Sequence, residues 1–189
     1  MLTRRETRLP DVWLLESRAF PDERGYFMEV HHTERLRALG LDLTFVQDNL
    51  SWSHPGVLRG MHFQAPNPQG KLIRALQGRI WDVAVDVRPG SPTFGQWEAY
   101  DLSAENQRAV YIPEGFAHGF LVTEGPALVL YKCTGLWDAS SELTLRYDDP
   151  DVGIEWPAPA TIVSPKDEVG LLLRDLPAER LALLGGDGA

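Results

Sequence analysis

Short apolar runs separated by turn signals at near-regular intervals are the feature that most limits how this chain can fold. The runs are rich in Val, Ile, Phe and Trp. The turn signals contain Pro or Gly and lie at 21–22 (PD), 55–56 (PG), 66–68 (PNP), 89–92 (PGSP), 113–115 (PEG) and 124–126 (EGP). Such residues fix φ or tolerate a positive value. Many short strands at this spacing must pair into sheets without free edges, so the pattern predicts an all-β, double-sheet jelly roll.

Strands are predicted between these turn signals, in apolar stretches of a few residues each. The predicted strands are residues 13–19, 26–30, 45–53, 57–63, 72–76, 80–87, 97–102, 109–112, 116–122, 127–132 and 143–147. They leave little room for long helices. The pattern therefore predicts a chain made mainly of strand, with a few short helices.

Two short helices are expected outside the strands. The first would have Thr33 as its N-cap, Leu36 and Leu39 on one face, and Gly40 at its end. The second would cover residues 176–184, with Pro177 opening the turn, Gly185-Gly186 ending it and a frayed tail beyond.

Length and hydropathy indicate one soluble domain. A chain of 189 residues can form one sizeable core but is short for two, so residues 1–189 are predicted to form a single domain. No apolar run approaches the roughly 20 residues that a membrane helix needs. The N-terminus contains arginines without a following apolar stretch, so we expect no secretory signal and a cytoplasmic location.

Charge and cysteine content exclude several classes of partner and site. The formal net charge is −9, and the acidic residues are spread along the chain, so free nucleic acid is not expected to bind. A local cluster of basic residues can still hold a small phosphorylated ligand. Cys133 is the only cysteine, which excludes an intrachain disulfide and a multi-cysteine zinc site. We expect Cys133 to be a small buried hydrophobic residue on a strand.

Residues 56–71 (GVLRGMHFQAPNPQGK) combine unlike chemistry in one window. Arg59 and Lys71 are permanent cations, and His62 can exchange a proton near neutral pH. Taken singly, the cations would be solvated charges at strand ends and the histidine an interior residue. Together, in a window bounded by Pro55-Gly56 and Gln69-Gly70, they indicate a binding or catalytic pocket.

Arg59 and His62 are separated by an odd number of positions, so on a regular strand their side chains point to opposite sides. Both reach one pocket only where the strand is irregular. Gly60 lies between them and suits such a position. We therefore predict a bulge or twist at Gly60.

Residues 112–120 (IPEGFAHGF) place a histidine after a Pro-Glu-Gly turn. Pro113, Gly115 and His118 resemble the second motif of the cupins, a jelly-roll superfamily in which many members bind a metal through this histidine. The first cupin motif adds HxH and a glutamate, but here His62 is followed by FQ. Metal sites commonly need three or more protein ligands. The sequence therefore predicts a cupin that uses neither metal nor cofactor.

An ordered set of short motifs resembles the dTDP-4-dehydrorhamnose 3,5-epimerase family. The motifs are DERG at 22–25, FVQDN at 45–49, GVLRGMH at 56–62, QGKL at 69–72, WDVAVDVR at 81–88, SPTFG at 91–95, LSAEN at 102–106, IPEGFAHGF at 112–120, YKCT at 131–134, DDP at 148–150 and KD at 166–167. They follow one another in the order seen in that family. The resemblance covers residues 20–167, most of the chain.

The resemblance implies an acid–base reaction on a thymidine-diphospho (dTDP) 4-keto-6-deoxy sugar. The ketone at carbon 4 acidifies the hydrogens of both neighbouring carbons, and inversion needs a base on one face and an acid on the other. By resemblance, His62 is the base and Tyr131 the acid. Asp167 would orient His62, and Lys71 would hold the enolate oxygen. Without the ordered motifs, Tyr131 would be an ordinary strand aromatic and Asp167 a turn residue.

The resemblance also assigns substrate-binding residues. Phosphate binding falls to Arg59, with help from Arg24 and His118. Contacts to the nucleotide or sugar fall to Gln47, Asn49, Glu29, Glu142 and Lys166. In the family, Arg24, Phe27 and Glu29 come from the neighbouring subunit. The resemblance therefore implies a homodimer with shared active sites.

Leu136-Trp137 departs from the family pattern, in which many members carry two tyrosines and the second stacks on the thymine ring. Trp137 offers a larger face for the same stacking. The alternative is a tryptophan that packs against the pocket wall.

The predicted function is cofactor-free inversion of carbons 3 and 5, converting dTDP-4-dehydro-6-deoxy-glucose into dTDP-4-dehydro-rhamnose. The nearest alternative is a 3- or 5-epimerase that inverts one centre of the same class of substrate, for cell-wall rhamnose or for a natural-product glycoside. Two alternatives from other classes are a metal-dependent cupin oxygenase and a non-catalytic sugar-nucleotide binder.

Overall fold

A computed structural model describes residues 2–184 of the chain. Its strands, in chain order, are β1 (Leu2–Arg5), β2 (Trp13–Ser17), β3 (Ala19–Asp22), β4 (Gly25–Met28), β5 (Gln47–Ser53), β6 (Leu58–Gln64), β7 (Lys71–Asp86), β8 (Trp97–Ser103), β9 (Arg108–Ile112), β10 (Phe116–Cys133) and β11 (Glu142–Thr144). Its helices are α1 (Thr33–Ala38), α2 (Pro165–Glu168) and α3 (Ala178–Leu181), with 3₁₀ turns η1 (Leu173–Asp175) and η2 (Ala182–Leu184). Strands dominate, as predicted.

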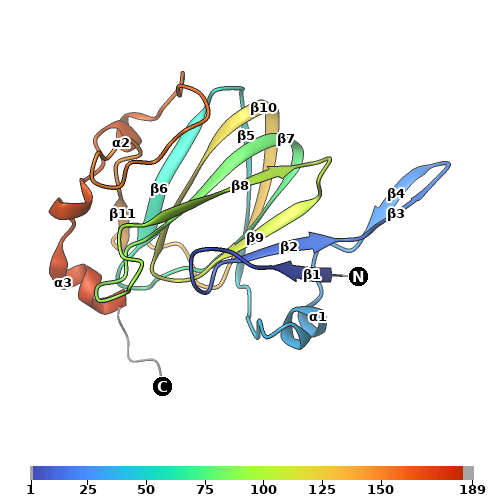
Figure 1. Cartoon of the computed structure of the whole chain (residues 1–189), viewed down its shortest axis with the longest axis horizontal. Helices are drawn as coiled ribbons and strands as arrows, with labels where there is room; N and C mark the ends of the chain where they lie inside the picture. Colours follow the sequence, from blue (N-terminus) through green and yellow to red (C-terminus); the bar gives the residue numbers. More distant parts are fainter. Residues whose placement is uncertain (1, 185–189) are drawn as a thin grey trace.

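Two antiparallel layers share the long strands β7 and β10 (Figure 1). The first layer has the order β1-β2-β9-β7-β10-β5, and the second has the order β8-β7-β10-β6-β11. The start of β7 pairs with β9 and its end with β8. The start of β10 pairs with β6 and its end with β5. This all-β, jelly-roll-like arrangement confirms the predicted fold class.

The two longest strands correct the prediction, because each contains two of the predicted strands. Residues 72–76 and all of 80–87 except Val87 lie in β7, and residues 116–122 and 127–132 both lie in β10. The turn signal at 124–126 bends its strand instead of ending it. Gly78 has a φ of +69°, and a Cβ there would lie 2.4 Å from the carbonyl oxygen of Glu124. The two bends therefore lie against each other, where both strands pass between the layers.

The N-terminal strands contain further differences from the prediction. β1 and β3 are not predicted by the apolar pattern, since their residues are mostly exposed. The Pro-Asp pair at 21–22 lies within β3, and the hairpin turns at Glu23 and Arg24 instead. Hairpin β3–β4 projects away from both layers (Figure 1). Exposed strands of this kind lack the alternation of apolar and polar residues by which a strand is predicted from sequence.

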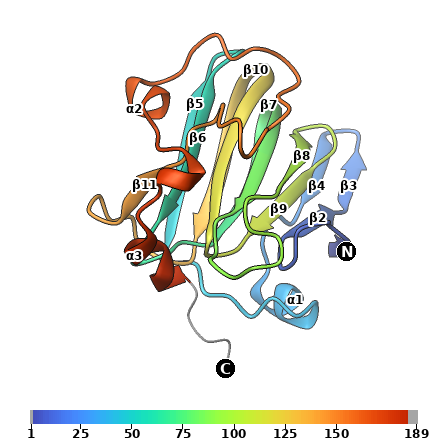
Figure 2. The same ribbon diagram turned by 60° about the vertical axis from the view of Figure 1, so that its left-hand side comes forward.

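Three groups of buried apolar residues hold the layers together. Ile73, Phe120 and Val129 belong to the group between the two layers. A second group covers the outer face of the second layer, where α3 contributes Leu181; Figure 2 shows α2 and α3 along β6 and β11. The third group packs Leu36 of α1 against β2 and β9. Cys133, at the end of β10, is fully buried, as expected.

Both predicted helices form, with corrected ends. Thr33 is the first residue of α1 and not its N-cap; His32 occupies the cap position without a side-chain bond. α3 spans only one turn after Pro177 and continues as η2. The predicted Gly185-Gly186 end and the frayed tail lie outside the described residues. Among residues 2–184, no helix has the length and apolar character that a membrane span requires.

Gly78→Ala should lower the free energy of unfolding by about 3 kcal/mol, because the new Cβ combines a positive φ with a clash against the Glu124 carbonyl. Gly90→Ala is the matched control: Gly90 also has a positive φ, +80°, but open space around it. We expect the control to lose about 1 kcal/mol. Urea denaturation of the variants measures both. Equal losses would contradict the close approach of the two bends.

Candidate active site

The inner face of β5 is polar, which reverses the usual orientation of a strand in a sandwich. The side chains on this face line the space between the layers and are Gln47, Asn49, Ser51 and Ser53. The alternate residues face outward, and Leu50 and Trp52 are 61% and 51% exposed. An interior lined by amides and hydroxyls suits a polar ligand better than an apolar core does.

Two adjoining cavities open beside β5 and share three wall residues. The larger is about 510 Å³ and the smaller about 290 Å³. His62, Lys71 and Tyr131 line both. His62 lies on β6 and Tyr131 on β10, so strands distant in sequence bring an imidazole, an amine and a phenol to the same hollow. The larger cavity also receives Arg59, His118, Lys166 and Asp167.

His62 and Asp167 form a direct pair. The distance from His62 Nε2 to Asp167 Oδ1 is 2.6 Å, and the Gly60 N–H donates to Asp167 Oδ2 at 3.2 Å. Asp167 lies on α2, and its own N–H donates to the hydroxyl of Ser164 at the helix N-cap. Burial raises the pKa of Asp167, but the hydrogen bonds and charge of His62 and the Gly60 N–H outweigh it, so the net pKa lies below the usual value.

The predicted irregularity at Gly60 is confirmed. The pairing of β6 with β10 shifts register opposite this residue, and Gly60 has a φ of +124°. A Cβ at Gly60 would lie 2.5 Å from Gly119 Cα, so a side chain has no room there. Because the backbone turns at this point, Arg59 and His62 both line the larger cavity.

Lys71 and Tyr131 lie on the neighbouring strands. Lys71 Nζ donates to the carbonyl oxygen of His62 at 3.1 Å. Burial lowers the pKa of the Lys71 amine and raises the pKa of the Tyr131 phenol. Tyr131 therefore keeps its proton at neutral pH and can donate it. The register places Tyr131 opposite Asn49 of β5.

A second carboxylate–imidazole pair lies deeper, between His118 and Asp82. The distance from His118 Nε2 to Asp82 Oδ2 is 2.8 Å, and the Asp82 side chain is fully buried. Burial raises the pKa of Asp82 and lowers the pKa of His118. The sequence reasoning missed the pairing role of Asp82. The sequence feature that could have revealed it is the carboxylate of Asp82 inside the apolar run 80–87, because a buried carboxylate requires a partner.

The remaining predicted residues of this chain lie at the rim of the cavities. Lys166 Nζ and Glu142 Oε1 are 2.6 Å apart. The Trp137 N–H donates to Gln47 Oε1 at 2.9 Å, while the Trp137 side chain is 58% exposed. Trp137 therefore lines the smaller cavity while staying largely exposed.

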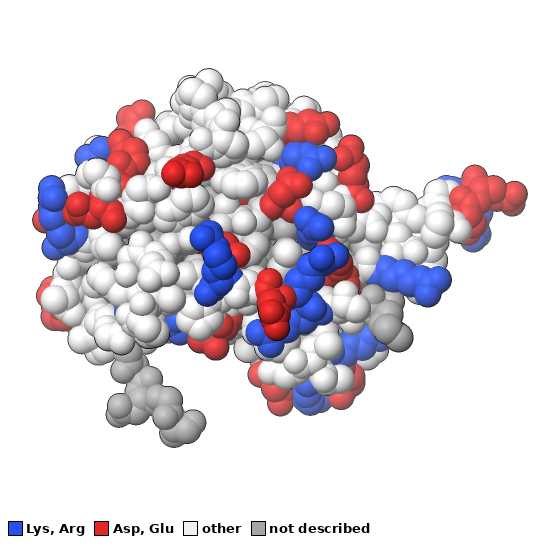
Figure 3. Space-filling view, in the orientation of Figure 1, with Lys and Arg blue, Asp and Glu red and all other residues white. Residues whose placement is uncertain are grey.

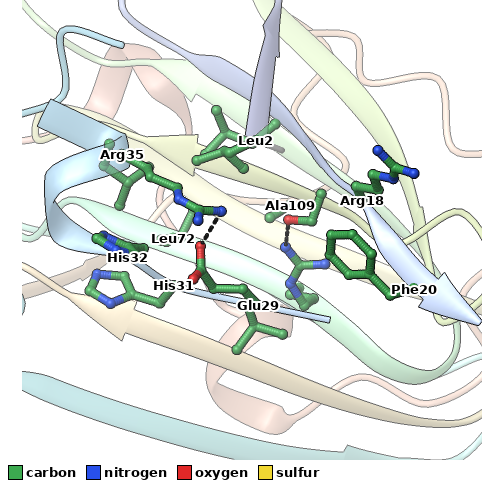
Figure 4. A pocket seen from close by; sticks show the side chains of 14 residues that line it. Leu2, Arg18, Phe20, Glu29, His31, His32, Arg35, Leu72 and Ala109 are labelled. Carbon is green, nitrogen blue, oxygen red and sulfur yellow. Dashed lines mark hydrogen bonds and ion pairs between the residues drawn. The ribbon is translucent and has the colours of Figure 1, made fainter. Parts of the chain in front are cut away.

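Arg24, Phe27 and Glu29 do not join this chain's cavities. Arg24 pairs with Asp22 at the tip of hairpin β3–β4, and Phe27 is 72% exposed. Glu29 pairs with Arg35 at 2.9 Å beside a separate hollow under α1 (Figure 4). That hollow has room for about 20 Å³, roughly the space of one water. These three residues do not line the two cavities that share His62.

The cupin-like motif does not assemble a metal-ligand set here. His118 is bonded to Asp82, and the described part of the chain contains no group of three or more His, Cys, Asp and Glu side chains placed to hold a metal ion. His31 and His32 line the separate hollow under α1 instead.

Residues 6–175 match the family model of dTDP-4-dehydrorhamnose 3,5-epimerase. The chain belongs to this family. Its members are isomerases, so the alternatives of an oxygenase and of a non-catalytic binder are set aside. This agrees with the resemblance drawn from the ordered motifs.

Individual epimerases are similar to the chain over most of its length. A dTDP-4-dehydrorhamnose 3,5-epimerase of Neisseria gonorrhoeae is 50% identical over 166 residues, which are 87% of this chain and 51% of that protein. The chain thus spans about half of that relative. A dTDP-4-dehydrorhamnose 3-epimerase of Streptomyces niveus is 39% identical, covering 87% of this chain and 80% of that protein. A 3,5-epimerase structure from Legionella pneumophila, in complex with dTDP-4-keto-L-rhamnose, is 43% identical with a TM-score of 0.94 and full coverage of both chains.

Asp167→Asn should destabilise this epimerase at neutral pH and not in acid. The folded pKa of Asp167 is depressed, so its ionised form contributes stability above the unfolded pKa of about 3.9, and the contribution is lost as pH falls through the folded pKa. Urea denaturation between pH 7 and pH 3 should show the difference from wild type shrinking below about pH 4. Asp175→Asn, which changes an exposed carboxylate, is the control. A difference that does not vary with pH would contradict the depressed pKa.

Proposed function

We propose that this epimerase inverts carbons 3 and 5 of dTDP-4-dehydro-6-deoxy-glucose to give dTDP-4-dehydro-rhamnose, without a cofactor. The observation that carries the proposal is the shared cavity, in which His62 is paired with Asp167 and faces the same space as Tyr131 and Lys71. Enolisation of a ketone needs this set of groups: a base, an acid and a cation for the oxygen.

In the proposed mechanism His62 removes the proton. When Nε2–H donates to Asp167, the lone pair of the neutral ring lies on Nδ1, and this nitrogen takes the proton from the carbon beside the ketone. The electron pair of the broken C–H bond moves to the carbonyl oxygen and forms an enolate. Asp167 fixes the tautomer and stabilises the imidazolium that results.

Tyr131 completes the inversion by donating its proton to the opposite face of the same carbon. The raised pKa of the phenol supports this assignment, since the proton is present at neutral pH. Lys71 stabilises the enolate oxygen during the interval between the two transfers. His62 then returns its proton to solvent, and Tyr131 takes one up, before the second centre reacts.

The nucleotide is proposed to lie along the two cavities. Arg59 binds the diphosphate, because a guanidinium fork matches two phosphate oxygens, and His118 assists from the same cavity. The amide and acidic groups of the smaller cavity contact the nucleoside or sugar, and Lys166 contacts it from the larger. They are Gln47, Asn49, Glu142 and Lys166. Trp137 stacks on the base or forms the wall beside it.

We infer that two copies of the chain share these sites. The outward face of β5 carries exposed apolar side chains, with Leu50 at 61% and Trp52 at 51%. Exposed apolar patches of this kind mark association surfaces. Hairpin β3–β4 projects beyond this body, and Figure 3 shows charges of both signs at its tip. In the proposed dimer, the hairpin and the residue that follows it would carry Arg24, Phe27 and Glu29 into the partner's cavity. None of the three lines the cavities of its own chain.

Inversion of a single centre is the second candidate. The Streptomyces niveus relative is named a 3-epimerase, and the same base, acid and cation serve one inversion or two. The difference lies in whether the enolate forms on both sides of the ketone.

Turnover in deuterium oxide should distinguish the two candidates. Each inversion exchanges one carbon-bound hydrogen for a solvent hydrogen, so mass spectrometry of the product should find two carbon-bound deuterons for double inversion and one for a single centre. We expect two.

His62→Ala should reduce turnover by about two to four orders of magnitude, the usual weight of acid–base catalysis. Undiminished exchange in that variant would remove His62 as the base.

Leu50→Glu should dissociate the proposed dimer and abolish most activity, because it buries a charge in an apolar interface and withdraws the partner's residues from the site. Leu183→Glu, at another leucine that is 57% exposed, is the matched control and should leave the dimer intact. Analytical ultracentrifugation and turnover measure the two effects. A fully active Leu50→Glu monomer would overturn the shared site.

A further inference from the structure

We propose that Ser53 is a positioning residue that orients Arg59 for the diphosphate of the substrate. This inference rests on the proposed function of Arg59. It adds a residue that neither the ordered motifs nor the family resemblance assigns. In this arrangement the end of the guanidinium formed by Nη1 and Nη2 faces the phosphate.

The contact is short and comes from a buried group. Ser53 is 2% exposed, and its Oγ accepts a hydrogen bond from Arg59 Nε at 2.9 Å. Arg59 Nη2 also lies 3.5 Å from the carbonyl oxygen of Trp52. Among residues 2–184, the side chain of Arg59 makes no other hydrogen bond. The partners from β5 therefore occupy one edge of the guanidinium.

The occupied edge determines which donors remain for a ligand. A guanidinium presents five N–H donors in a fixed planar fork. With the side that carries Nε held by β5, the end formed by Nη1 and Nη2 stays available to the cavity. Two N–H groups at that end match two oxygens of one phosphate. A lysine at position 59 would lose both the hold of Ser53 through Nε and the fork.

Ser53 and Arg59 both lie on strands that pair with β10, so the backbone positions of the two residues are fixed relative to each other. Ser53 pairs with Ala127 of β10, and Arg59 pairs with Phe120 of β10. The hydrogen bond thus joins the last residue of β5 in the first layer to β6 in the second. Arg59 itself is exposed, and a long exposed side chain loses rotamer freedom when it binds. Ser53 removes part of that loss before the ligand arrives.

The test is a double-mutant cycle with dTDP as the probe, measured by calorimetry on the full-length protein. Ser53→Ala should weaken dTDP binding about tenfold, the order expected for one lost hydrogen bond from a charged group. It should raise KM for the keto sugar and leave kcat nearly unchanged, since no reacting atom is touched. Ser53→Thr keeps the hydroxyl and should restore most of the affinity. In an Arg59→Ala background, Ser53→Ala should change the affinity by less than about twofold.

The outcomes separate this inference from the proposed function. The role of Ser53 would be overturned, and that of Arg59 kept, if Arg59→Ala weakened dTDP binding but Ser53→Ala did not. The same conclusion would follow if the two effects simply added in the double variant. Unchanged binding in Arg59→Ala would remove Arg59 from the phosphate site, and the inference with it. Ser103→Ala is the control, because Ser103 is also buried, at 1% exposed, on distant β8; its dTDP affinity should equal that of wild type. If Ser53→Ala does not fold, Ser53→Cys keeps the side-chain size with a weak acceptor and gives the same test.

Discussion

The contact between two glycine backbones, Gly60 on β6 and Gly119 on β10, is the constraint on which the site depends. A Cβ at Gly60 would lie 2.5 Å from Gly119 Cα, and a Cβ at Gly119 would lie 2.7 Å from the carbonyl oxygen of Arg59. Because neither residue has a side chain, the strands approach closely and β6 can turn between Arg59 and His62. The same turn aims the Gly60 N–H at the carboxylate of Asp167. One backbone contact therefore sets the proposed phosphate ligand, the proposed base and the carboxylate that holds it.

The cavity contains two carboxylate–imidazole pairs whose surroundings differ. The His62 side chain is 30% exposed and its partner Asp167 is 4% exposed, whereas His118 and Asp82 are 8% and 0% exposed. Burial shifts the pKa values of the deeper pair towards the neutral forms. In the outer pair, hydrogen bonds keep the Asp167 pKa low despite burial. Both imidazoles line the larger cavity, but the outer pair is partly open to solvent, whereas the deeper pair is shielded from it by burial.

Much of the fold and part of the site were predictable from sequence, and the failures have physical causes. Apolar alternation located the interior strands, and the odd spacing of Arg59 and His62 predicted the irregularity at Gly60. The pattern could not predict that the turn signal at 124–126 would bend its strand, or that β7 would bend at Gly78, because both bends depend on their contact in space. Nor could it predict α2, a single turn capped by Ser164. The partners Asp82 and Ser53 were missed because a single sequence does not reveal which distant side chain a polar group meets.

Asp167 lies 105 positions after His62, on a segment that follows every strand of both layers. During synthesis on the ribosome, the imidazole is therefore made long before the carboxylate that orients it. A chain that stops after β11, or that loses α2 by cleavage in the preceding loop, keeps all its strands and the cavity residues Arg59, Lys71 and His118, but it loses Lys166 together with Asp167. It lacks the carboxylate that is proposed to orient His62. A truncation outside the sheets would thus remove the partner of the proposed base while removing no strand.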